Sequence, residues 1–192
     1  MKRAAVVVAA TALAWSVMGV ASAFVVGKPE VDKAAATFNG QAAPKIARCV
    51  GEDGDPYVQY TGTWSGSMSE SSPVPGDFPL SGPLTTNLDI VQNVTTGAGE
   101  AQGTVSLQAA AGGSKTLQGR ITLVTQRTPD LIEGRGMIVA NSLDPTGKPT
   151  GDRLVANVEV SINRTSYILT GSFGGAASWP DFSIKDNNQS CV

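Results

Sequence analysis

Apolar and polar residues alternate along the chain from Tyr57 onward, in runs that end at Gly, Pro, Asn or Asp. This period of two is typical of half-buried β-strands, because successive side chains of a strand point to opposite faces. The cleanest apolar face consists of Leu154, Ala156, Val158, Val160 and Ile162. We find no sustained helical period after residue 23, so the pattern predicts an all-β domain.

The breaks between these runs define the expected strands. The alternation covers residues 58–68, 84–94, 104–109, 117–126, 131–141, 154–162 and 167–173, and a short last strand is expected at 182–185. Residues 71–83 contain four prolines, so we expect a long loop there rather than a central strand. The sequence therefore predicts about seven or eight antiparallel strands with mostly short connections.

Glycine recurs inside the predicted strands, at positions 62, 66, 103, 119, 134, 136 and 171. Such glycines would weaken a flat sheet, whereas closed barrels use them to bend and coil their strands. The sequence therefore favours a single antiparallel up-and-down β-barrel. A sandwich of two sheets is the alternative, because both folds bury one face of each strand.

The first 23 residues have the organisation of a secretory signal peptide. Lys2 and Arg3 precede an uncharged apolar run, and Ala21-Ser22-Ala23 is a small-x-small cleavage pattern. We expect cleavage after Ala23, and an uncleaved anchor over residues 4–26 is the alternative. The prediction is export to the periplasm, the cell surface or the medium, and the Ala-rich signal suggests a bacterial source.

Residues 24–44 are rich in Ala, Gly, Lys and Pro and show no sustained period, so we expect an extended arm that leads to an all-β domain at 45–192. The two cysteines, Cys49 and Cys191, should form a disulfide, because exported proteins fold in an oxidising compartment. A redox or metal-binding pair is the alternative. Neither cysteine belongs to a Cys-x-x-Cys unit, which favours the structural bridge.

The composition excludes several kinds of chemistry. The chain has no histidine, which rules out a Ser-His-Asp triad, a Cys-His pair and His-ligated zinc. The net charge of −2 becomes −4 once Lys2 and Arg3 leave with the signal, so neither nucleic acid nor an anionic membrane is an expected partner. Residues 52–55 hold three carboxylates, and we expect a solvated turn rather than a calcium site. No metal or cofactor is predicted.

One short motif carries a resemblance to known proteins. The segment Thr61-Gly62-Thr63-Trp64-Ser65-Gly66 contains a Gly-x-Trp triplet that resembles the one in lipocalins and, more loosely, in avidins. The resemblance covers about six residues. It implies a calycin-like barrel, in which the tryptophan closes one end of a ligand-holding lumen. The other lipocalin motifs are missing, so the triplet is more an indication of fold than of function.

Four residues are candidates for ligand binding. Glu133 and Arg135 lie two residues apart and share one strand face, so they could place a carboxylate and a guanidinium in a barrel lumen. A solvent-facing pair or a cross-strand salt bridge is the alternative. Trp64 and Tyr167 could line the same lumen, although either could equally be a core residue.

These observations leave three functional hypotheses. The first is an exported non-catalytic barrel that acts as a structural or interaction module, whose partner is another surface protein. The second is a barrel that binds a small apolar ligand. The third is a small isomerase-type enzyme that uses Glu133 or Asp89 with Tyr167. No recognisable catalytic set supports the third hypothesis.

Overall fold

The computed structural model describes residues 35–71, 80–108 and 116–174. All of them belong to a compact unit that spans Lys33–Val192, and the chain's other unit is Met1–Asp32. The predicted signal peptide, the expected strand at 182–185 and Cys191 lie outside the described residues.

Every regular element in the described part of the chain is a β-strand. The nine strands are β1 (Ala36–Gln41), β2 (Lys45–Val50), β3 (Pro56–Glu70), β4 (Gly82–Asn93), β5 (Ala98–Gln108), β6 (Thr116–Arg127), β7 (Leu131–Leu143), β8 (Pro149–Asn163) and β9 (Ile168–Phe173). Among the same residues, no helix is long and apolar enough to cross a membrane. The predicted all-β class is confirmed.

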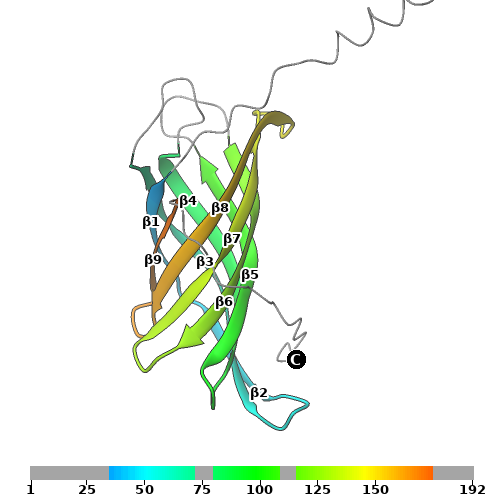
Figure 1. Ribbon diagram of the computed structural model, residues 1–192, viewed down its shortest axis with the longest axis vertical. Helices are drawn as coiled ribbons and strands as arrows, with labels where there is room; N and C mark the ends of the chain where they lie inside the picture. The colour runs from blue at the N-terminus through cyan, green and yellow to red at the C-terminus, as the bar shows by residue number, and fades with distance from the viewer. Residues whose placement is uncertain (1–34, 72–79, 109–115, 175–192) are drawn as a thin grey trace, which may run out of the picture. The chain divides into compact units, whose positions relative to one another are not determined.

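The strands form one closed antiparallel barrel (Figure 1). From β3 to β9 each strand pairs with the next one along the chain. β1 pairs with β9 on one side and with β3 on the other, which closes an eight-stranded cylinder. β2 is the ninth strand and pairs with the first part of β3. The barrel prediction is therefore confirmed, and the two-sheet alternative is excluded.

The strand that closes the barrel was not expected. Residues 24–44 were predicted to be an extended arm, but residues 36–41 form β1, with Ala36 and Phe38 buried in the core. These six residues do alternate, but the run is short and Phe38 is the only large apolar side chain on its inner face, which is a weak signal for a strand. Pairing along both edges and burial of the Phe38 ring, which lies over Gly171 of β9, supply what the local pattern lacks.

Large apolar side chains fill the interior of the barrel. The fully buried ones include Trp64, Leu88, Ile90, Leu107, Leu123, Ile132, Ile138 and Leu169. Gln92 is also fully buried, and its amide donates a hydrogen bond of 3.0 Å to the Thr125 hydroxyl. The outer face is largely polar, as where the Asp89 carboxylate accepts hydrogen bonds from Gln59 and Thr61. The barrel therefore has an apolar, occupied interior.

Glycine allows β1 and β3 to approach closely at the barrel's closing seam. Gly66 of β3 is paired with Gly40 of β1. A Cβ atom on Gly66 would lie 2.0 Å from the backbone oxygen of Asn39, a distance that no side chain can occupy. The seam therefore depends on the lack of a side chain at position 66.

We predict that Gly66→Ala destabilises the protein by about 1–3 kcal/mol, because the added methyl group must push β1 away from β3. The control is Ser67→Ala at the next position, which is exposed and should change stability by less than about 0.5 kcal/mol. Urea unfolding followed by tryptophan fluorescence measures both. Equal stability of the two variants would contradict the close approach at this seam.

Candidate functional site

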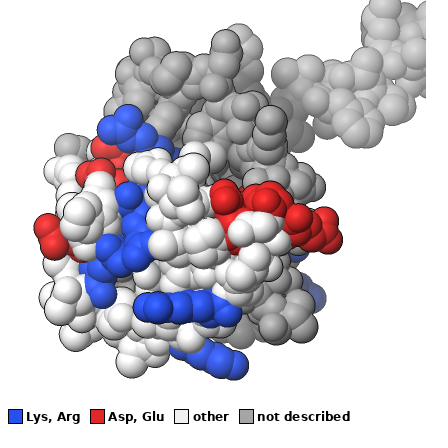
Figure 2. All heavy atoms as spheres, turned by 90° about the horizontal axis from the view of Figure 1, so that it is seen from below, with Lys and Arg blue, Asp and Glu red and all other residues white. Residues whose placement is uncertain are grey.

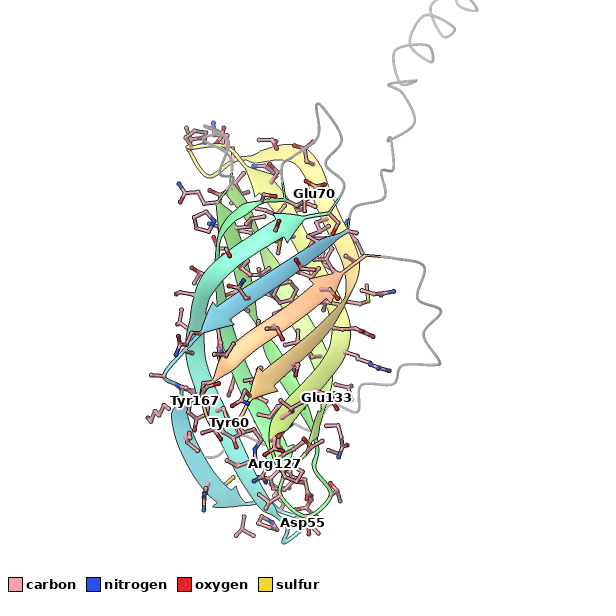
Figure 3. The ribbon with its side chains drawn as sticks, turned by 90° about the vertical axis from the view of Figure 1, so that its left-hand side faces the viewer. Asp55, Tyr60, Glu70, Arg127, Glu133 and Tyr167 are labelled. Carbon is pink, nitrogen blue, oxygen red and sulfur yellow. The ribbon has the colours of Figure 1, made fainter. Side chains whose placement is uncertain are left out.

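Four connections meet at one end of the barrel, the lower end in Figure 1, beside the projecting hairpin of β2 and β3. They are residues 51–55, 94–97, 128–130 and 164–167. Tyr60, Tyr167 and Arg127 lie close together at this end (Figure 3). Residues from two of these connections (94–97 and 164–167), from β2 and β3 and from the end of β6 line a pocket of about 550 Å³, called here the lower pocket.

One part of the lower pocket is apolar and aromatic. Tyr60 and Tyr167 line its inner side, and Ile46, Val50 and Val94 line its outer part. These three aliphatic side chains are 44%, 71% and 42% exposed, so they present apolar surface to solvent. Exposed apolar side chains grouped in a concavity are typical of a binding surface.

The other part of the lower pocket is basic. Arg48, Arg127 and Arg164 line it, and none of the described lining residues carries a carboxylate. Arg164 also holds the neighbouring turn, because its Nη1 donates hydrogen bonds to the backbone oxygens of Thr128 and Pro129. Figure 2 views this end from below, with basic side chains across its left and lower parts and the largest acidic group at the right.

The nearby acidic groups are engaged in the β2–β3 hairpin. The Tyr57 hydroxyl donates a 2.6 Å hydrogen bond to Asp53, and the Asn93 amide donates one of 2.6 Å to Asp55. The hydrogen bond from Tyr57 lowers the pKa of Asp53, and the same bond raises the pKa of Tyr57. These carboxylates therefore stabilise a turn, and neither of them is among the described residues that line the pocket.

Tyr167 occupies a strained backbone position beside the pocket. The side-chain oxygens of Asn93 and Asn163 each accept two backbone N–H groups of the turn that follows. Each turn then ends in a left-handed residue, Gly97 with φ of 75° in one and Tyr167 with φ of 54° in the other. A tyrosine in this conformation is unusual, and its carbonyl is held by a 3.0 Å hydrogen bond from Trp64 Nε1.

Trp64 is a core residue. Its side chain is 1% exposed and borders neither the lower pocket nor the groove described next. A Cβ on Gly62 would be crowded, because it would lie 3.1 Å from Pro44 and 3.3 Å from the tryptophan ring. Gly40 of β1 leaves similar room beside the Trp64 Cβ. The motif therefore packs the barrel interior in this protein.

Glu133 and Arg135 point away from the interior. Both are exposed on the outer face of β7, where they border a shallow groove of about 760 Å³ over β6 to β9. The hypothesis that they face a lumen is therefore wrong, because Ile132, Gly134 and Gly136 occupy the inner face. Arg135 forms an exposed cross-strand ion pair with Glu159, in which Nε lies 3.5 Å from Oε1. This is the arrangement that the sequence indicated as the alternative.

The structure does not bring the four predicted ligand-binding residues together. Trp64 is inside, Glu133 and Arg135 are outside, and Tyr167 alone lines the lower pocket. Asp89, on the outer face of β4, is three strand positions from β7, about 14 Å away at ordinary strand spacing. Sequence reasoning missed the pocket arginines, whose positions at strand ends and turns gave no signal of their convergence.

Comparison with known proteins found no match for this chain. No protein-family model, no curated protein and no solved structure matches it. A functional proposal therefore rests on the geometry of the described residues.

We predict that Tyr57→Phe raises the pKa of Asp53 toward the ordinary aspartate value of about 3.9, because the largest cause of its lowering is removed. A carboxyl whose folded-state pKa is lowered stabilises the fold above the unfolded-state pKa. That stabilisation is lost as the pH falls through the folded-state pKa. Carboxyl ¹³C NMR titration measures the shift. Asp144, whose pKa is lowered mainly by a hydrogen bond from Thr146, is the internal control. An unchanged pKa of Asp53 in the variant would contradict the role given to the Tyr57 hydrogen bond.

We also predict that Arg135→Gln changes the free energy of unfolding by less than about 0.5 kcal/mol, because exposed ion pairs are screened by solvent. The side chains of Arg135 and Glu159 are 69% and 60% exposed. Denaturant unfolding in low and high salt measures the effect. A loss of several kcal/mol would show that this ion pair is structural.

Proposed function

We propose that this chain is an exported, non-catalytic interaction module whose filled barrel supports a binding surface at the lower pocket. The observation that carries the proposal is the location of the exposed apolar and cationic groups. Ile46, Val50 and Val94 lie in one concavity with three arginines, while the interior is occupied. A rigid barrel that presents such a surface suits recognition of another molecule at its rim.

The occupied interior argues against the ligand-carrying hypothesis. A carrier of apolar molecules needs a lumen, and Trp64, Leu88 and Ile138 fill the space where one would lie. The enzymatic hypothesis has even less support, because Asp89, Glu133 and Tyr167 lie on different parts of the barrel. General acid-base catalysis requires groups within hydrogen-bond reach of one substrate.

Export and the disulfide are part of the same proposal. The sequence supports cleavage after Ala23 in a bacterial secretory route, and Cys49 lies half-buried on β2. A bridge from Cys49 to Cys191 would fix the end of the chain beside the β2–β3 hairpin. The intact mass of the exported protein tests both points. A chain that begins at Phe24 and weighs two hydrogen atoms less than its reduced form is expected.

We predict that a benzophenone photocrosslinker at position 94 captures a partner in the cells that export the protein, while one at position 155 does not. Val94 lies in the lower pocket and Val155 is equally apolar and exposed on the outer face of β8. Denaturing gels after illumination compare the two. The same products from both positions, or products from position 155 alone, would contradict the assignment of the surface to the lower pocket.

Native mass spectrometry separates this function from a ligand carrier. We expect the native and denatured masses of the exported protein to agree, because large buried side chains occupy the interior of the described barrel. Extra mass that survives several purification conditions and disappears on denaturation would favour the carrier hypothesis instead.

A further inference from the structure

One edge of the sheet lacks a partner strand at the lower pocket. β1 and β2 follow one another along β3, with β1 opposite residues 65–70 and β2 opposite residues 56–61. Of these two strands β9 pairs with β1 alone, and it begins with Ile168 opposite Gln41. Among the described residues, β2 therefore has β3 on one side and no strand on the other. We call this position, where a continuation of β9 would lie, the β2 edge.

The backbone of β2 offers hydrogen-bonding groups to this edge. The Gly51 N–H donates a 2.8 Å hydrogen bond to the Asp55 oxygen at the base of the hairpin. In an antiparallel ladder, alternate residues direct their N–H and C=O groups toward the partner strand. The register from Gly51 back to Lys45 has no irregularity. Ile46, Arg48 and Val50 therefore direct their backbone N–H and C=O groups away from β3, toward the β2 edge.

The same three residues present their side chains to the lower pocket. Ile46, Arg48 and Val50 are paired with Tyr60, Val58 and Pro56, and all six line the pocket. Residues opposite each other in a ladder share one face, so an added strand would place alternate side chains in the pocket. The edge and the pocket are therefore two parts of one surface.

We propose that the β2 edge binds an extended acidic segment of a partner protein by strand addition, with the pattern apolar-x-acidic-x-apolar. This inference rests on the proposed interaction function and names its partner class. The acidic residue pairs with Arg48, and the two apolar residues lie opposite Ile46 and Val50. Main-chain hydrogen bonds supply affinity in this mode of recognition, and side-chain pockets supply specificity.

Charge complementarity selects the acidic residue. Arg48, Arg127 and Arg164 line the pocket without a carboxylate among its described lining, so an acidic side chain is attracted there. A second copy of the chain is a poorer occupant. Two β2 edges side by side would bring Lys45 and Arg48 of one copy against the same basic residues of the other.

A fluorescein-labelled peptide tests the proposal. The probe is Gly-Val-Ser-Asp-Ser-Val-Gly-amide with fluorescein on its N-terminal amine, titrated with the full exported chain and followed by fluorescence anisotropy. Binding should saturate and weaken as salt is raised, because it includes an exposed charge pair. A peptide with lysine at the central position should bind at least about tenfold more weakly.

Two variants examine the backbone and the charge separately. Val50→Pro removes one backbone N–H at the β2 edge and keeps an apolar side chain, so it should weaken binding of the acidic probe. Proline is tolerated at such edges, so the fold should be kept. Arg48→Glu should weaken binding of the acidic probe by about tenfold or more and restore binding of the lysine peptide. Arg120→Glu is the matched control, because Arg120 is an exposed arginine on β6 outside the pocket, and it should leave both affinities unchanged.

Three outcomes would overturn the proposal. Equal binding of the acidic and lysine peptides would remove the charge selection. Binding of the acidic probe that appears only after addition of a thiol reductant would assign the edge to residues 175–192 of the chain itself. Absence of binding together with a concentration-dependent dimer in analytical ultracentrifugation would assign it to a second copy. The crosslinking and native-mass results would stand in each case, since they test the interaction function alone.

Discussion

The structure depends on the double pairing of β1. This six-residue strand forms ladders with β3 and β9, and without it the remaining strands would leave two open edges. Closure brings the first described strand against the last, so the seam joins residues more distant in sequence than any hairpin does. It requires backbones to approach closely, and Gly66 has no side chain to prevent this. The apolar interior is sealed because this short strand holds both neighbours.

Closure also determines where the exposed surface lies. β3 is long enough to pair with two strands in succession, but β9 covers only the first of them. The β2 segment therefore extends past the closed cylinder and forms one wall of the lower pocket. Residues such as Trp64 and Leu88 are buried inside the barrel, whereas Ile46, Val50 and Val94 present apolar surface to solvent at the lower pocket.

The lower pocket is coupled to the core through Tyr167. Its left-handed backbone and its carbonyl are fixed by the asparagine-capped turn and by the hydrogen bond from the buried Trp64 indole. Gly97 adopts a similar backbone conformation in the corresponding turn at much lower steric cost. Packing of Tyr167 against the core offsets that cost and holds an aromatic side chain at the pocket. The strained backbone of Tyr167 is thus part of what places its side chain at the pocket.

The sequence alone determined the strand class, most strand positions and the barrel, because a period of two and repeated glycines are local properties. It could not decide which face of β7 was inside, since small residues alternate there with larger ones, and the inner face proved to be the small one. It also missed β1, whose stability comes from partners on both sides. Tertiary structure alone brought Arg48, Arg127 and Arg164 together, because ring closure joins strand ends that no local spacing relates.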